Sequence, residues 1–370
     1  MSLRRLAAAA LLVAAAALPL HGALAEKDNR LNFYNWSDYI AKDTIPEFEK
    51  ATGIVVQSSY YDGNEMLDAK LREGRSGYDV VVPSATPFMA VQIGAGVYRP
   101  LDKAKLPNLK NLDPQILALV ADAADPGNTY GVPYLWSFTG IGYNVAALRQ
   151  ALGDDAPRDS LALLFDPANA SRLAACGIEV LDTPEEVFPA ALSYLGRDPT
   201  SRDLADLAAA EAVVAKVRPY IRKFHSSQYI NDLAGGDICL ALGYSGDVVQ
   251  ARRRAAEAKN GVDVAFVVPR EGAQMAVDML AIPADAPHPE NALAFIDFIL
   301  RPEIIAKISN EVDYPNPNLA ATPLVDADIR GDPAIYPPEA IRERLHIDPA
   351  ASQEYERART RAWIRVKSGC

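Results

Sequence analysis

The first hundred residues that follow the amino-terminal segment alternate between strand and helix patterns. Short apolar runs at 31–34, 54–57 and 78–82 are typical of buried strands, and helical periodicity fills 43–50 and 65–72, with Asn64 as the expected cap of the second helix. A β-α-β-α-β order predicts an α/β fold with a mostly parallel sheet. Ligands bind beyond the carboxyl ends of such strands, where the sequence places residues 35–39 and 83–84.

The remaining chain continues the mixed pattern, with one interruption. Residues 131–140 are rich in Gly, Pro and aromatic side chains and predict an extended segment that crosses between two lobes. Helices are expected at 184–195, 204–217, 289–300 and 302–309, and strands at 238–243, 262–268 and 279–282. Because 370 residues suffice for two domains and no long linker separates them, the pattern favours hinge motion about a cleft.

The amino terminus has the features of a cleavable export signal. Arg4 and Arg5 precede an apolar run at 6–20, and Ala23-Leu24-Ala25 provides a small-x-small cleavage site. We expect a signal peptide at 1–25 and a mature chain that starts at Glu26. A membrane anchor is the alternative, but the apolar run is too short to span a bilayer comfortably.

The overall charge excludes one class of partner. The chain has 37 basic and 48 acidic residues and a formal net charge of -11. Proteins that bind nucleic acids need clustered Lys and Arg for the phosphate backbone, so nucleic acid is not an expected partner. A cationic ligand agrees better with this charge.

Three cysteines are present, at Cys176, Cys239 and Cys370. In an oxidising compartment the first two can pair, which would leave the terminal Cys370 free. Three reduced structural thiols are the alternative at this point.

The sequence has no signature of catalysis or metal binding. It lacks the Gly-x-Ser-x-Gly, Gly-x-x-x-x-Gly-Lys and His-Glu-x-x-His motifs, and its four histidines are far apart. His225 stands beside Ser226 and Ser227, but a lone His in a Ser-rich loop is weak evidence for a nucleophilic site. We therefore expect no metal, no cofactor and no catalysis.

Aromatic and acidic residues at predicted loop positions suit another chemistry. An alkyl diamine needs a carboxylate or an aromatic face for each ammonium group and apolar walls for the methylene chain between them. The carboxylates must be separated, since two adjacent ones would raise each other's pKa or bind a divalent metal. The candidate residues are Trp36, Asp38, Tyr39, Glu186, Tyr244, Asp247, Asp278 and Tyr314.

Several motifs in the same order resemble the periplasmic putrescine- and spermidine-binding proteins of ABC importers. They are found at 34–40 (Tyr-Asn-Trp-Ser-Asp-Tyr-Ile), 78–84, 141–144, 224–233, 320–324, 335–338 and 361–363, and so cover nearly the whole mature chain. The resemblance, which is closest to the putrescine-binding type, implies a two-lobed type II fold hinged around a central cleft. It also implies a periplasmic, monomeric protein that delivers its ligand to an inner-membrane permease without catalysis.

The resemblance further implies a lobe division and a ligand set. Lobe 1 would comprise 26–135 and 261–309, and lobe 2 would comprise 136–260 and 310–370. Cys176 and Cys239 match a cysteine pair of the family, which strengthens the disulfide expectation. The implied ligand contacts are Trp36, Tyr39, Tyr244 and Tyr314 as aromatic walls, Ser37 and Ser84 as polar contacts, Asp247 and Glu186 at the ammonium groups, Asp278 near one end, and Asp38 as an aid to closure. A one-residue shift would exchange Glu186 with Glu185.

Two departures from the putrescine-binding pattern concern ligand length. Ala276 stands where a large aromatic residue is typical, so one wall of the site is expected to be open. Asp348 stands where an apolar residue would suit a diamine, and it would either meet a third amine or cap a turn in solvent. Putrescine is the expected ligand, with spermidine or another longer amine as the alternative. An amine-sensing role and an exported enzyme with Glu186 or Asp278 as general base are the rival functions.

Overall fold

A computed structural model describes residues 29–369 of the chain. The expected signal peptide, the mature start at Glu26 and the expected free Cys370 lie outside these residues. Within residues 29–369, no helix has the length and apolar character needed to cross a membrane.

The strands form one sheet with the order β2-β1-β3-β9-β4-β7-β5-β6, in which β10 adds to β9 and β8 to β4. Their bounds are β1 Arg30–Trp36, β2 Val55–Tyr61, β3 Val80–Val81, β4 Gly131–Asn144, β5 Ile178–Val180, β6 Lys223–Phe224, β7 Leu240–Tyr244, β8 Val264–Val267, β9 Ala273–Ala281 and β10 Leu345–His346.

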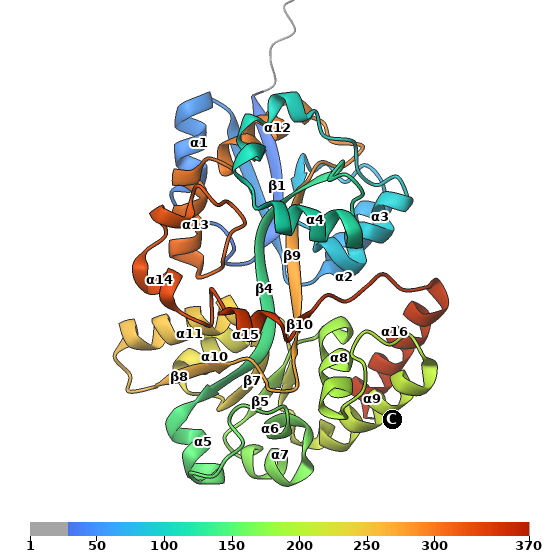
Figure 1. Ribbon diagram of the computed structural model, residues 1–370, viewed down its shortest axis with the longest axis vertical. Helices are drawn as coiled ribbons and strands as arrows, with labels where there is room; N and C mark the ends of the chain where they lie inside the picture. Colours follow the sequence, from blue (N-terminus) through green and yellow to red (C-terminus); the bar gives the residue numbers. More distant parts are fainter. Residues whose placement is uncertain (1–28, 370) are drawn as a thin grey trace, which may run out of the picture.

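Parallel pairing occurs at both ends of the sheet, and antiparallel pairing joins them. Strand β1 pairs in parallel with β2 and β3, and β5 pairs in parallel with β6 and β7. The long strand β4 runs antiparallel to β9 and β7, and its whole length is buried. Figure 1 shows β4 and β9 side by side through the middle of the molecule, between an upper and a lower group of elements. The predicted α/β class and the crossing segment at 131–140 are thus confirmed.

Helices cover the sheet in both halves (Figure 1). Their bounds are α1 Thr44–Thr52, α2 Asn64–Arg72, α3 Ala90–Gly94, α4 Pro114–Ala123, α5 Val145–Leu152, α6 Ala162–Phe165, α7 Pro167–Leu173, α8 Pro184–Tyr194, α9 Leu204–Val217, α10 Tyr229–Gly235, α11 Ser245–Ala258, α12 Pro289–Ile299, α13 Pro302–Val312, α14 Ala327–Gly331, α15 Glu339–Arg342 and α16 Gln353–Ser368.

The bounds of the predicted strands differ from those observed, and two of the differences have a clear structural reason. The strand expected at 78–82 is reduced to Val80–Val81, because the buried side chain of Asp79 takes the backbone N–H of Asn32 at 2.8 Å in place of a backbone partner. The strand expected at 279–282 begins earlier, at Ala273. Both faces of this strand are largely covered, so it lacks the alternation of apolar and polar residues that marks a half-buried strand.

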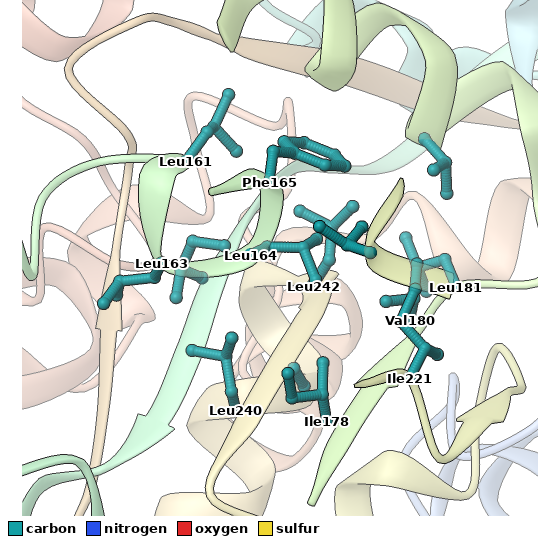
Figure 2. Close-up of a cluster of buried hydrophobic side chains, with 14 of the residues drawn as sticks. Leu161, Leu163, Leu164, Phe165, Ile178, Val180, Leu181, Ile221, Leu240 and Leu242 are labelled. Atoms are coloured by element: carbon teal, nitrogen blue, oxygen red, sulfur yellow. The ribbon is translucent and has the colours of Figure 1, made fainter. Parts of the chain in front are cut away.

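Separate apolar cores stabilise the two halves. Figure 2 shows part of the lower core, where Leu161, Phe165, Leu181 and Leu242 gather over β5 and β7. The upper core includes Phe33, whose ring lies edge-on to Phe295 at 5.0 Å between centroids. Residues 312–325 also contribute side chains to the upper core, and the division into lobes stays a prediction.

The predicted disulfide is confirmed. Cys176 and Cys239 are bonded, with their Cα atoms 5.5 Å apart. The bond closes a chain segment of 63 residues within the lower half.

Candidate ligand-binding cleft

A cavity lies between the two halves, at the carboxyl ends of β1 and β3 and the amino ends of α8 and α11. Nine of the ten predicted ligand contacts line it: Trp36, Ser37, Tyr39, Ser84, Glu186, Tyr244, Asp247, Asp278 and Tyr314. Its volume of about 60 Å³ holds roughly four to six water-sized groups. Such a slot suits a slender, unbranched chain.

Asp247 occupies the first turn of α11 and is fixed by two tyrosines. The hydroxyl of Tyr229 donates to its Oδ2 at 2.6 Å, and the hydroxyl of Tyr314 donates to its Oδ1 at 2.7 Å. Burial raises the pKa of Asp247 to about 6, although these hydrogen bonds oppose the shift. Neutral donors therefore orient the carboxylate, and a nearby cation would stabilise its charged form.

Asp278 projects from β9 and is held in the same manner. Its Oδ1 accepts a hydrogen bond from Ser84 Oγ at 2.6 Å, and its Oδ2 accepts one from the Tyr39 hydroxyl at 2.7 Å. Burial raises the pKa of Asp278 to about 6.

Asn64 does not cap α2 with its side chain as expected. Its amide nitrogen donates to the Ser84 hydroxyl, and its amide oxygen accepts the backbone N–H of Ser84, so that Asn64 positions this contact.

Glu186 lies in the first turn of α8, in the lower half. Thr139 Oγ1 donates to its Oε2 at 2.5 Å, and Gln274 Nε2 donates to its Oε1 at 2.9 Å. Burial raises the pKa of Glu186 to about 8, against the effect of Thr139. The amide and the hydroxyl therefore hold an acid that is costly to ionise while the cavity is empty.

An aromatic pair connects two of these acids. The rings of Tyr39 and Tyr314 meet edge to face at 4.7 Å between centroids, with the hydroxyl of Tyr39 on Asp278 and that of Tyr314 on Asp247. The two tyrosines thus link Asp278 and Asp247 through one ring contact. We call Glu186, Asp247 and Asp278 the three cavity carboxylates.

Further aromatic rings complete the walls. The indole of Trp36 donates from Nε1 to the carbonyl oxygen of Val82 at 2.8 Å and packs on Tyr61 at 4.7 Å between centroids. Tyr244 ends β7 and also faces the cavity. Ala276 lines the cavity as well, so the position expected to be open contributes only a methyl group.

Asp38 differs from the other predicted contacts in that it does not line the cavity. Its carboxylate is half exposed and pairs with Arg254 of α11 at 3.2 Å. The same loop is held by Gln250, which donates to the carbonyl oxygens of Val312 and Asp38. These contacts join the β1–α1 loop to α11.

Both expectations for Asp348 are wrong. This residue is buried, 1 % exposed, and its carboxylate pairs with Arg202 at 2.7 Å and with Arg359 at 3.2 Å. It neither faces solvent nor lines the cavity. Because two arginines occupy its oxygens, it is not available to a ligand.

His225 has a local structural contact. Its Nδ1 accepts the backbone N–H groups of Ser227 and Gln228, which stabilises the turn before α10. Among residues 29–369, no group of three or more His, Cys, Asp or Glu side chains is placed to hold a metal ion.

Several lining residues were not predicted. They are mostly uncharged and come from both halves, from loops as well as from β2, β4, β9 and the amino-terminal turns of α2, α8 and α10: Tyr61, Asp62, Asn64, Thr86, Pro87, Phe88, Ser137, Thr183, Glu185, Ser226, Ser227, Ile230 and Gln274. Thr86 to Phe88 begin two residues after the predicted contact Ser84, so their position shortly after β3 was a usable signal. Gln274 had no such signal, because the predicted strand began five residues later.

Comparison with known proteins agrees with this geometry. The chain is 52% identical over 349 residues to the putrescine-binding periplasmic protein PotF of Escherichia coli K12, with 94% of each chain covered. It is 51% identical over 358 residues to the putrescine-binding periplasmic protein SpuD of Pseudomonas aeruginosa UCBPP-PA14, covering 95% of this chain and 97% of SpuD.

The fold also matches solved structures. The spermidine/putrescine ABC transporter substrate-binding protein PotD of Streptococcus pneumoniae superimposes with a TM-score of 0.73 at 26% identity, over 92% of this chain and 99% of that one. The family model described as bacterial extracellular solute-binding protein matches residues 43–337. The chain therefore belongs to the bacterial extracellular solute-binding proteins, with the type II two-lobed fold.

Proposed function

We propose that the protein is the binding component of a polyamine ABC importer and captures putrescine in the cavity between its lobes. One observation carries this proposal: three buried carboxylates stand at separate places around a narrow aromatic slot. Among the described residues that line the slot, none is Lys or Arg. Buried carboxylates without a fixed counter-charge favour a cationic ligand.

Different residues of the cavity bind the ammonium groups and the methylene chain of the ligand. One ammonium group binds at Asp247, and the other binds at Glu186, with Asp278 near one end. Trp36, Tyr39, Tyr244 and Tyr314 provide faces for the methylene chain and the cations, and Ser37 and Ser84 provide polar contacts. The hydrogen bonds from Tyr229, Thr139 and Gln274 keep the acids in place before the ligand arrives.

Ligand binding favours the closed form. The diamine contacts Asp247 and Glu186 from the lower half and Tyr39 and Asp278 from the upper half, so only the closed form makes all contacts. In this proposal, lobe 1 comprises 26–135 and 261–309, and lobe 2 comprises 136–260 and 310–370. Residues 312–325 are the exception, because their side chains contribute to the core of lobe 1. Arg254 and Asp38 then form an ion pair across the closed cleft.

Delivery to a membrane permease follows from the family and from the export signal. The named relatives are periplasmic putrescine-binding proteins. We infer that the signal peptide directs this chain to the periplasm, where it acts as a monomer and presents the closed form to an inner-membrane permease. A receptor in place of the permease would make it a sensor with the same ligand.

The size of the cavity favours a short diamine. A volume of about 60 Å³ leaves little space beyond one slender chain. The small side chain of Ala276 allows some increase in ligand width, and a longer amine would have to extend out of the cavity. Spermidine is therefore the second candidate.

Thermal unfolding of the mature, refolded protein tests the proposal. Putrescine, cadaverine, agmatine, spermidine and spermine are compared at equal concentration. A ligand at 100 times its Kd stabilises the folded state by about 2.7 kcal/mol, and putrescine should raise the Tm by several degrees. No shift with any amine would refute polyamine binding, and turnover of an amine during hours of incubation would support an enzyme instead.

A further inference from the structure

The carboxyl-terminal helix α16 contributes a buried arginine to the wall of a space that adjoins the cavity. Arg359 is 2 % exposed, and its guanidinium pairs with Glu185 at 2.7 Å, with Glu356 at 2.7 Å and with Asp348 at 3.2 Å. Burial lowers the pKa of Arg359, but the three carboxylates raise it above its ordinary value. The guanidinium is therefore a permanent positive charge in this wall.

Glu185 lies where the cavity meets a second, larger space. This outer vestibule has a volume of about 710 Å³ and shares Asp62, Pro87, Phe88, Glu185 and Ser226 with the cavity. An amine too long for the cavity can extend into the vestibule past these shared residues. Glu185 is a buried carboxylate on this route.

The vestibule has more acidic than basic residues in its lining. These are the carboxylates Asp62, Glu65, Asp68, Asp182, Glu185 and Glu356 and the cations Arg72, Arg359 and Lys367. Loss of solvation raises the pKa of Glu65 to about 8, and the charge of Glu185 adds to the shift. Oε2 of Glu185 is buried and has no hydrogen-bond partner among the described residues, whereas Oε1 is held by Arg359. A ligand cation that arrives here would share the Glu185 carboxylate with Arg359 and would be repelled by the positive charge of the guanidinium.

We propose that Arg359 is a positioning residue that sets the number of ammonium groups the cleft accepts. Its guanidinium holds Glu185 in place of a third ligand ammonium, so that the cleft favours a diamine over a triamine. This inference rests on the proposed function, because it takes the cavity to be the diamine site.

The first turn of α8 shows the resulting division of roles. Glu185 and Glu186 are consecutive, and both are buried. Arg359 holds Glu185, while Thr139 and Gln274 hold Glu186 toward the cavity. One acid is thus neutralised by the protein, and its neighbour is left for the ligand.

Calorimetric titration with putrescine and spermidine tests the inference. The proteins are the wild type, Arg359→Gln, Arg359→Lys and the control Arg365→Gln, whose arginine lies on the same helix but pairs with Glu211 at the surface. Arg359→Gln should raise the ratio of spermidine to putrescine affinity at least tenfold. Arg359→Lys, which keeps the charge, and Arg365→Gln should leave this ratio within threefold of the wild type.

A purely structural arginine would give another result. Its loss would lower the Tm and both affinities together, and an unchanged ratio in Arg359→Gln would overturn the inference. If wild-type protein binds neither amine, the proposed function fails; if it binds putrescine and the ratio does not move, only the role of Arg359 fails.

A matched pair of variants keeps the test valid if Arg359→Gln does not fold. Glu185→Gln and Glu186→Gln make the same change at neighbouring positions of α8. Because Arg359 holds Glu185, the loss of putrescine affinity should be at least tenfold smaller in Glu185→Gln than in Glu186→Gln. Equal losses in the two variants would show that Glu185 binds the diamine directly, and would overturn the inference.

Discussion

Replacement of Asp247 by Asn should remove most of the affinity for putrescine. Asp247 is 8 % exposed, and the two hydroxyls that donate to its carboxylate, those of Tyr229 and Tyr314, are neutral. In the variant, the ammonium group would be buried without its counter-charge. Removal of one partner of a buried ion pair costs about 3–5 kcal/mol. We take the lower value, because Asn retains part of the hydrogen bonding, and about 3 kcal/mol corresponds to a more than hundredfold rise in Kd.

Isothermal titration calorimetry at pH 8, where Asp247 is ionised in the wild type, measures this change. Asp154→Asn is the control, because Asp154 is 68% exposed and pairs only with surface arginines. The control should bind as the wild type does, and the Tm of both empty variants should show that they fold. Affinity of Asp247→Asn within threefold of the wild type would refute the role of Asp247 as a ligand carboxylate.

Three further predictions concern pH, the disulfide and cleft closure. The three cavity carboxylates have pKa values of about 6 to 8 when the cavity is empty, and a bound ammonium favours their charged forms. Putrescine affinity should therefore rise from pH 5 to pH 8, and binding should release protons. Calorimetry in buffers of different ionisation heat measures both, and an affinity that does not change with pH, with no protons released, would contradict the prediction. Replacement of Cys176 and Cys239 by Ser should lower the free energy of unfolding by about 4 kcal/mol for a loop of 63 residues, and an unchanged urea midpoint would argue against it. Arg254→Gln should weaken binding only a few-fold, through faster dissociation, since an exposed ion pair contributes about 1 kcal/mol or less. Stopped-flow fluorescence measures the dissociation rate, and an unchanged rate would show that this pair has no part in closure.

Local patterns predicted the frame of the fold and the upper wall of the site. The strand–helix alternation predicted that β1, β2 and β3 are parallel, and therefore that Trp36, Tyr39 and Ser84 lie at one edge of the sheet, as they do. The Gly-, Pro- and aromatic-rich composition of 131–140 predicted the crossing strand β4. These features depend on residues close together in the sequence, which is where patterns are informative.

Long-range pairs were beyond this reasoning. Glu186 is held by Thr139 and Gln274, which lie 47 and 88 residues away in the chain. Arg359 lies 174 residues from Glu185, and nothing in the sequence predicted that the two would pair. The expectation for Asp348 was wrong for a related reason: of its two arginine partners, Arg202 lies 146 residues away, and Arg359, 11 residues away, had no predicted role.

The tyrosine that supports Asp247 illustrates an intermediate case. Tyr229 lies within the motif at 224–233 that resembles the polyamine-binding proteins, but a resemblance in sequence assigns no contact to it. Its hydroxyl reaches Asp247 because α10 and α11 pack together around β7. A supporting residue of this kind becomes evident only when the helices are placed.

The central claim is that the cleft recognises both ends of a diamine. The most direct test is to titrate the mature protein with putrescine and with 1-aminobutane, which has the same carbon chain and one ammonium group. We predict one putrescine per chain and at least hundredfold weaker binding of the monoamine, because one buried carboxylate end would be left without a cation. Equal affinities for the two amines would contradict the claim.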